Sequence, residues 1–275
     1  MFNIKESTDY YIKKGYELDY ATSKVSQDII LSCIAKSTLR KNVTIKGGVV
    51  LFNITGDKRR ATEDIDIDFI RYSLEDESIE RFFNKLKNKE LGILFKLASK
   101  PKSLNHEDYK GKRVFINIVD SFQNNIEVKI DIGVQSDLSI KQEEYLFNFE
   151  FSKDKLTLQI NSKEQIFVEK LASFIKHGIR STRYKDIYDF YYFISESKLD
   201  DKKVLKLIDS YILGKKPNIR SVSDIYNELN LIFDNRMFLN SVKDSKYNWI
   251  EVDSNLAIKT VLDYIKSIEG LLIYE

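Results

Sequence analysis

Acidic and large apolar residues alternate through residues 62–69, which read TEDIDIDF. Because side chains of a β-strand point alternately to the two faces of a sheet, Asp64, Asp66 and Asp68 are expected to share one face. The apolar residues between them would pack on the other face. Three carboxylates on one face repel one another unless a cation lies among them. The segment therefore predicts a strand that is buried on one side and carries a cation site on the other.

A pair of glycines comes shortly before this strand. Gly47 and Gly48 follow a short apolar run at residues 43–45 and precede a helix-compatible run at 49–52. Bare backbone N–H groups at the start of a helix favour a phosphate group. A phosphate-binding turn beside metal-binding carboxylates indicates nucleotide chemistry.

Two other interpretations of the acidic segment are open. An EF-hand loop accounts for the spacing of the acids up to Glu75, but it needs a glycine where this chain has Phe69. A solvated edge strand with protective acidic side chains also explains the alternation, without any ligand. The glycine pair and a further acidic strand downstream favour the metal site over both.

That further strand is expected at residues 126–133. Asp131 lies there between two isoleucines, where a carboxylate is poorly placed unless it binds a metal. Glu127 and Lys129 would share its face, so a solvated strand face remains an alternative. Two carboxylates from the first strand and one from the second can hold divalent cations that activate a hydroxyl and stabilise a leaving pyrophosphate. All-oxygen ligands favour Mg²⁺, with Mn²⁺ as the alternative cation.

Three motifs together resemble the AbiEii/AbiGii-type toxins of the DNA polymerase β-like nucleotidyltransferase superfamily. The resemblance covers residues 40–195. The motifs are Lys46-Gly47-Gly48, Arg60-x-Thr62-x-Asp64-Ile65-Asp66 and Lys185-Asp186-Ile187-Tyr188-Asp189. The resemblance implies an α+β fold, with a polymerase β-like mixed-sheet lobe followed by a C-terminal helical lobe.

The resemblance also assigns site residues. It implies that the glycine pair binds the triphosphate of an NTP and that Asp64 and Asp66 are the metal-binding pair, although a register shift to Asp66 and Asp68 is open. Thr62 stands where related toxins often carry a serine that a kinase-like antitoxin phosphorylates, which would add negative charge beside the metal. The assigned metal ligands are Asp64, Asp66 and Asp131; the assigned catalytic residues are these three with Lys185 and Asp186; and the assigned nucleotide-binding residues are Lys46, Gly47, Gly48, Thr62, Lys170 and Asp189.

Residues 162–194 are expected to form two helices. Ser162 opens the first with a capping box, and Gly178 ends it. On the second helix, Lys185 and Asp189 are four residues apart and share one charged face. A salt-bridged surface helix explains this spacing equally well. The resemblance favours a place in the active-site cleft, with lysines on the phosphates and aspartates orienting the lysines or the acceptor.

Two closely packed lobes are expected from the length and the 43% of hydrophobic residues. Residues 1–160 would form the nucleotidyltransferase core lobe with N-terminal helices, and residues 161–275 a helical lobe contributing to the active-site cleft. Further helices are expected at 7–40, at 78–91 with Ser78 as N-cap, and at 202–213, 222–240 and 254–268; further strands are expected at 94–99, 113–119, 145–151 and 156–160.

Composition limits the other classes of function. A single cysteine excludes an internal disulfide, and two histidines leave little material for a His-based zinc site or a Ser-His-Asp triad. The net charge of +2 does not require nucleic acid. Lys110, Lys112 and Arg113 are nevertheless expected to cluster in a loop, where they form either part of a basic rim suited to RNA or ordinary solubility charge. No signal-peptide core or membrane-spanning run is present, so a cytoplasmic protein is expected.

These features predict a Mg²⁺-dependent nucleotidyltransferase toxin of a toxin–antitoxin system that defends against phage. It would transfer NMP from an NTP to an acceptor. By resemblance, the acceptor is the 3′ end of a tRNA, translation is blocked, and a cognate antitoxin is a partner. One alternative is a nucleotidyltransferase acting on a small molecule such as an antibiotic. Another is a nucleotide- or protein-binding module that has lost catalysis.

Overall fold

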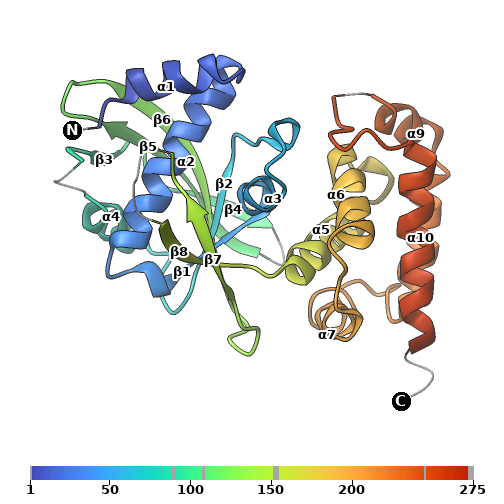
Figure 1. Cartoon of the computed structure of the whole chain (residues 1–275). Coiled ribbons are helices and arrows are strands. Elements are labelled where there is room, and N and C mark those ends of the chain that lie inside the picture. The colour runs from blue at the N-terminus through green and yellow to red at the C-terminus, as the bar shows by residue number, and fades with distance from the viewer. Residues whose placement is uncertain (1, 88–90, 107–108, 151–154, 245, 272–275) are drawn as a thin grey trace. The chain divides into compact units, whose positions relative to one another are not determined.

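The computed structural model describes residues 2–87, 91–106, 109–150, 155–244 and 246–271, with the side chains of 105, 106, 109 and 110 left out (Figure 1). The chain divides into two units, Met1–Asn161 and Ser162–Glu275. The first unit holds a mixed sheet with helices, and the second unit is helical in its described residues.

The strands of the first unit form one sheet in the order β3-β5-β6-β2-β1-β8-β7, and β4 pairs with β5 beside β3. Pairing is parallel between β1 and β8 and between β2 and β6, and antiparallel elsewhere, so the sheet is mixed. The strands are β1 Val43–Lys46, β2 Ile65–Phe69, β3 Leu94–Leu97, β4 Lys102–His106, β5 Tyr109–Val119, β6 Asn125–Val134, β7 Glu143–Asn148 and β8 Lys155–Ile160.

The alternation in residues 62–69 forms the strand that it predicts. Ile65, Ile67 and Phe69 of β2 are fully buried. The Phe69 ring packs 4.9 Å from the ring of Phe82 on helix α4 (Asp76–Lys85), so the apolar face of β2 belongs to the core. Since side chains alternate along a strand, the aspartates of β2 lie on the opposite face.

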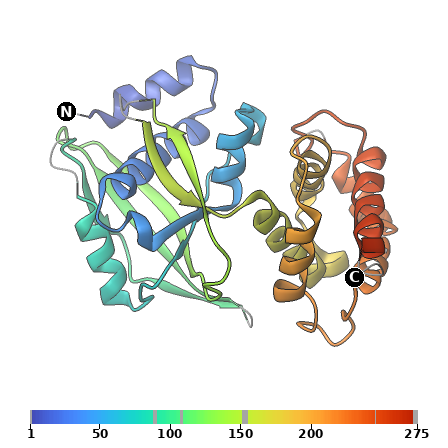
Figure 2. The same cartoon turned by 60° about the horizontal axis from the view of Figure 1, so that its bottom comes forward.

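The described residues of the first unit hold three α-helices besides α4. Helices α1 (Ile4–Lys13) and α2 (Leu18–Lys36) pack side by side, and α2 contacts β6 and β8 (Figures 1 and 2). Helix α3 (Gly47–Thr55) starts directly after β1 and contacts β2. The strand–turn–helix–strand order expected for this part of the chain is therefore confirmed.

The second unit is built around aromatic side chains. Phe167 and Phe190 meet edge to face with their ring centroids 5.1 Å apart, and Phe174 packs beside Phe238 at 5.5 Å. Helix α10 packs against α6 and α8, while α5 packs against α7 (Figure 2). The helices are α5 Lys163–His177, α6 Tyr184–Ser195, α7 Asp201–Tyr211, α8 Val222–Phe233, α9 Arg236–Val242 and α10 Ser254–Leu271.

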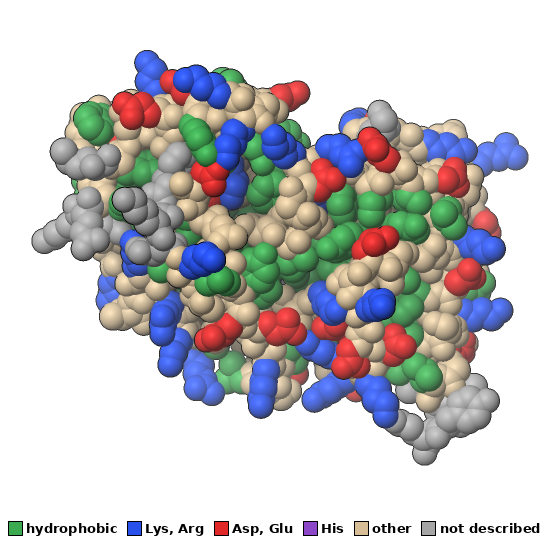
Figure 3. Space-filling view, viewed as in Figure 1, with side chains coloured by type: hydrophobic (Ala, Val, Ile, Leu, Met, Phe, Trp, Pro, Cys, Tyr) green, Lys and Arg blue, Asp and Glu red, His purple; other side chains and the backbone are tan. Residues whose placement is uncertain are grey.

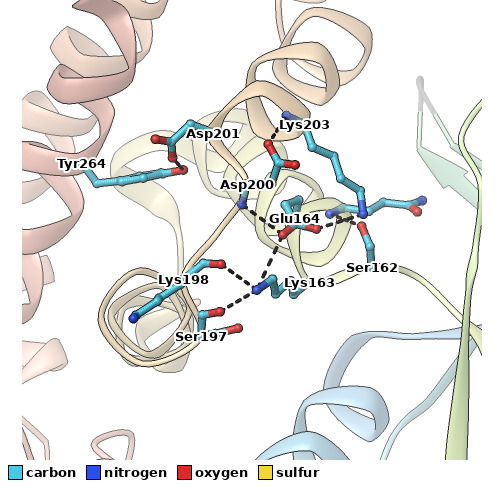
Figure 4. Close-up of polar contacts among 10 residues, drawn as sticks. Ser162, Lys163, Glu164, Ser197, Lys198, Asp200, Asp201, Lys203 and Tyr264 are labelled. Atoms are coloured by element: carbon cyan, nitrogen blue, oxygen red, sulfur yellow. Dashed lines mark hydrogen bonds and ion pairs between the residues drawn. The ribbon is translucent and has the colours of Figure 1, made fainter. Parts of the chain in front are cut away.

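Polar contacts fix the start of α5 against its neighbours (Figure 4). The Ser162 hydroxyl accepts a hydrogen bond from the N–H of Gln165, as the predicted cap requires, and Gly178 ends the helix at φ +54°. The buried Glu164 carboxylate accepts a hydrogen bond from the N–H of Asp200 at 3.2 Å and pairs with Lys203 Nζ at 3.0 Å. These contacts tie the first turn of α5 to the first turn of α7.

Three local expectations are wrong. Helix α4 starts at Asp76 with Glu75 as N-cap, because acidic residues already suit the positive end of a helix, so Ser78 lies inside it. Residues 222–240 hold two helices, because Asn235 accepts a hydrogen bond from the N–H of Phe238 and starts α9.

The third wrong expectation is the loop around Lys112 and Arg113. Both residues lie on β5, and β4, which was not expected, pairs with this part of β5. The other expected strands are present, and residue 151 lies outside the described residues. In the part of the chain that the structure describes, none of the helices has the length and apolar character needed to cross a membrane.

Candidate active site

Four charged side chains lie in one row across four neighbouring strands. The register places Lys46 opposite Asp66, Asp66 opposite Asp131, and Asp131 opposite Arg113. Directly opposite residues of a sheet project to the same face, so all four lie on the face away from Ile65 and Phe69. The row has basic residues at its two ends and two aspartates in the middle.

The glycine pair reaches this row at the start of α3. Gly47 has φ +65°, and a Cβ there would lie only 2.5 Å from Asp66 Oδ2. A Cβ on Gly48 would lie 2.8 Å from Thr62 Oγ1. The backbone thus passes so close to Asp66 and Thr62 that a side chain has no room. This places the first N–H groups of a helix beside a carboxylate, as a phosphate–metal site requires.

Arg113 holds Asp131 through two hydrogen bonds. Its Nε donates to Oδ1 and its Nη2 donates to Oδ2, each at 2.8 Å. The hydrogen bond and charge of Asp131 raise the pKa of the Arg113 guanidinium, and the charges of Asp64 and Asp66 raise it further. The guanidinium is therefore within electrostatic reach of all three carboxylates assigned to metal binding. Apolar residues alternate at Val114, Ile116 and Ile118, all of which are buried. This alternation in the sequence indicates that Arg113 lies on the opposite, polar face.

The two other aspartates of the acidic segment also have lysine partners. Asp64 precedes β2, is half exposed, and lies 2.5 Å from Lys129 Nζ of β6. Asp68 is buried, and its Oδ1 lies 2.7 Å from Lys46 Nζ. Asp68 thus shares the polar face with Asp66 but is held by the lysine at the end of β1.

The donor set fits a divalent cation at one place. Asp66 and Asp131 are opposite each other on adjacent strands, offer only oxygen, and lie beside the glycine turn. Within the described residues no three acidic, histidine or cysteine side chains stand as a ready-made metal-binding group. A group of three ligands would form if Asp64 left Lys129 and if Asp131 loosened its contact with Arg113. Neither Arg113 nor Lys129 was assigned to the metal site from the sequence.

Thr62 lies at the edge of this site. Its carbonyl accepts a hydrogen bond from Nε2 of Gln27, a buried residue of α2, at 2.8 Å. Its hydroxyl faces Gly48. This contact holds the segment between α3 and β2 against α2. No local sequence pattern indicates that Gln27 contacts Thr62.

A second polar cluster lies in the helical unit. Lys170 of α5 places its Nζ 2.6 Å from Asp186 Oδ1 and 3.0 Å from Asp189 Oδ2, both on α6. Asp189 is fully buried and also accepts a hydrogen bond from Trp249 Nε1 at 2.9 Å. Lys185 lies half-buried on the same helix. The surface-helix interpretation of the aspartates is wrong, because both are buried.

Asp186 directs its second carboxylate oxygen toward Arg183. Among the described residues, its buried Oδ2 has no hydrogen-bond donor, and Arg183 Nη1 lies 3.6 Å away.

The assigned residues therefore form two groups, one in each unit. The first group contains Lys46, Gly47, Gly48, Thr62, Asp64, Asp66 and Asp131, and the second contains Lys170, Lys185, Asp186 and Asp189.

The surface does not show the expected basic rim on the face drawn in Figure 3, where basic and acidic side chains are interspersed. Lys112 of the expected basic cluster is paired with Asp76 at 2.8 Å.

Comparison with known proteins gives one family. The model of the family described as nucleotidyl transferase AbiEii toxin, type IV toxin–antitoxin system, matches residues 29–245. The matched residues include both groups. No curated protein matches the chain.

Proposed function

This chain belongs to the AbiEii family of nucleotidyl transferase toxins of type IV toxin–antitoxin systems, and we propose that it transfers NMP from an NTP to the 3′ end of a tRNA with Mg²⁺ as cofactor. The modified tRNA could no longer accept an amino acid, so translation would stop. The reaction would take place in the cytoplasm, under control of the antitoxin that the family implies.

The register of Asp66 opposite Asp131, beside the turn at Gly47, is the observation that carries the proposal. In this proposal Asp66 and Asp131 hold the cation, with Asp64 as the third ligand. When bound, Mg²⁺ supplies charge neutralisation of the phosphates and a lower pKa for the attacking hydroxyl. The N–H groups at the start of α3 bind the triphosphate, where the positive end of the helix favours it.

We further propose, on the resemblance to the family, that charged residues of the helical unit take part in the reaction. Asp186 and Asp189 fix the ammonium of Lys170, so that it is ordered before a phosphate binds. By the resemblance, Asp186 orients Lys170 or the acceptor, and its Oδ1 already contacts the Lys170 ammonium. Lys185 is a second lysine for the phosphates. These residues act by positioning and charge, without a covalent intermediate.

A transfer assay tests the proposal. Each α-³²P-labelled NTP is incubated with total bacterial tRNA and Mg²⁺, using the wild-type chain, Asp66→Ala and Asp76→Ala. Asp76 is the matched control, because it is an exposed aspartate at the start of α4 and pairs with Lys112 of β5. We expect label on tRNA with the wild type and Asp76→Ala, and none with Asp66→Ala.

Two results would contradict the proposal. Equal labelling by Asp66→Ala would show that the row on the sheet is not the catalytic site. Absence of label from folded wild-type protein with every NTP would show that tRNA is not the acceptor. Small-molecule hydroxyl acceptors would then be assayed with the same three proteins.

A further inference from the structure

Arg113 differs from the other cations of the sheet in how it is held. Both oxygens of Asp131 accept a hydrogen bond from its guanidinium, and Asp64 and Asp66 are within its electrostatic reach. The register fixes this arrangement, because Arg113 and Asp131 are opposite each other on β5 and β6. One positive charge thus interacts electrostatically with the same three carboxylates that are proposed to bind the metal.

The contact is also exchangeable. The Arg113 side chain is 38% exposed and that of Asp131 is 22% exposed, whereas Lys46 and Asp68 are only 14% and 5% exposed. The two-point geometry strengthens this pair, but water reaches both partners, so the guanidinium can exchange Asp131 for solvent at a lower cost than in an enclosed pair. The pair of Lys46 and Asp68 is more deeply enclosed and more costly to break.

We infer that Arg113 is a resident cation of the acidic site, which a divalent cation must displace from Asp131. This inference rests on the proposed function, since it takes Asp66 and Asp131 as metal ligands. Two positive groups on one carboxylate repel each other, so the guanidinium lowers the affinity of the site for a free divalent cation. Arg113 acts here as a positioning residue, through Asp131.

The contact between Arg113 and Asp131 bears on how the site would bind a metal–nucleotide complex. A nucleotide brings phosphates, and a guanidinium binds phosphate oxygens with the same fork of N–H donors that now binds Asp131. The metal–nucleotide complex therefore offers Arg113 a replacement partner, whereas a free cation offers none. The site is selective for the complex over the free cation.

Direct binding of Mn²⁺, without nucleotide, tests the inference. Free Mn²⁺ is followed by electron paramagnetic resonance during titration of the full chain as wild type, Arg113→Gln, Lys112→Gln and Asp66→Asn. Lys112→Gln is the matched control, because it removes the same charge from the adjacent position of β5, where the partner is Asp76. Thermal melting of each variant confirms that it is folded.

We expect Arg113→Gln to bind Mn²⁺ roughly fivefold more tightly than the wild type, as removal of one partly exposed charge contact implies. Lys112→Gln should remain within about twofold of the wild type, since Lys112 projects to the opposite face of β5 and its ammonium is paired with Asp76. Asp66→Asn should abolish binding.

Each other result has a defined meaning. Equal or weaker binding by Arg113→Gln, with binding lost in Asp66→Asn, would overturn the role of Arg113 and leave the proposed metal site standing. Equal tightening by Lys112→Gln would overturn it as well, because the effect would then be general electrostatics. Absence of Mn²⁺ binding in every folded variant would overturn the metal site and the inference together.

A second measurement follows Arg113 in the wild-type protein, and a variant is needed only to assign its resonance. The Nε–H of Arg113, assigned by its loss in Arg113→Lys, is followed by ¹⁵N NMR during titration with Mg²⁺. We expect its resonance to shift as the bond to Asp131 breaks. Saturation of the site with an unchanged resonance would overturn the inference.

Discussion

Gly47 and Asp66 approach each other so closely that a Cβ on Gly47 would lie 2.5 Å from Asp66 Oδ2. The contact joins the end of β1 and the start of α3 to the middle of β2. The turn assigned to phosphate and the carboxylate assigned to metal are therefore one rigid piece of structure. A change at either residue alters the position of the other.

Replacing Gly47 by alanine is expected to cost both stability and activity. The left-handed φ of +65° costs about 1 kcal/mol for a residue with a Cβ, and the clash with Asp66 adds about 1–3 kcal/mol. Gly56→Ala is the matched control, because Gly56 has the same φ and nothing lies within 4 Å of its added Cβ. Urea unfolding should therefore show a clearly larger loss for Gly47→Ala. Equal losses would mean that the approach to Asp66 has no energetic effect.

Asp66→Asn and Asp68→Asn are expected to have opposite profiles. Asp66→Asn should lower nucleotidyl transfer on the order of 100-fold or more, with little effect on folding, because its charge serves the ligand. Asp68→Asn should lower the free energy of unfolding by about 1–3 kcal/mol, because the enclosed Lys46 loses its ion pair with this carboxylate. Transfer assays and urea unfolding of both variants check this. A selective loss of activity in Asp68→Asn would instead favour Asp66 and Asp68 as the metal-binding pair.

Lys170→Met is expected to destabilise the helical unit strongly. The two buried carboxylates of Asp186 and Asp189 would lose the ammonium between them, which costs about 3–5 kcal/mol. Lys246→Met removes a lysine with similar geometry, 3.0 Å from Asp244, at a well-exposed site and should leave stability unchanged. Thermal or urea unfolding compares the two variants. A small effect of Lys170→Met would show that the aspartates do not depend on its charge.

Glu164 predicts a pH-dependent contribution to stability. Burial favours its neutral form, but hydrogen bonds from its own N–H, from Lys203 and from the N–H of Asp200 outweigh burial and lower the pKa of the carboxyl below 4.5 (Figure 4). A carboxyl with a lower pKa in the folded protein than in the unfolded chain stabilises the fold above its unfolded pKa. This contribution is lost as the pH falls through the folded pKa.

Glu164→Gln should accordingly lower the free energy of unfolding by about 1 kcal/mol at neutral pH. The difference from the wild type should shrink as the pH falls below 4.5, the ordinary pKa of the side chain. Urea unfolding at a series of pH values measures it, with the exposed Glu196→Gln as control. A difference that stays constant into acid would show that the ionised form of Glu164 is not the stabilising one.

Local patterns in the sequence account for much of the fold. The alternation around Ile65 and Ile67 identifies β2, and the glycine pair identifies the start of α3. Ser162 and Gly178 mark the ends of α5, because caps depend on residues within one turn of the helix. Each of these features is decided by residues that are neighbours in the chain.

The pairing of charges in the site is not decided locally. Arg113 meets Asp131 because the β5–β6 hairpin sets their register, and a shift of one residue would have turned Arg113 to the other face. Asp189 meets Trp249 from 60 positions away. Sequence patterns give the residue types of the site, but these partners depend on how the sheet and the helices are packed.

The indole that donates to Asp189 belongs to the chain's single tryptophan. Its ring is buried, and the carboxylate that it contacts is one of the two that pair with Lys170. When the protein is excited at a wavelength that tyrosine does not absorb, its emission therefore comes from one indole, a single hydrogen bond away from the charged cluster of the helical unit. The molecule carries its own optical probe, which reads out the charge state and ordering of that cluster without a label.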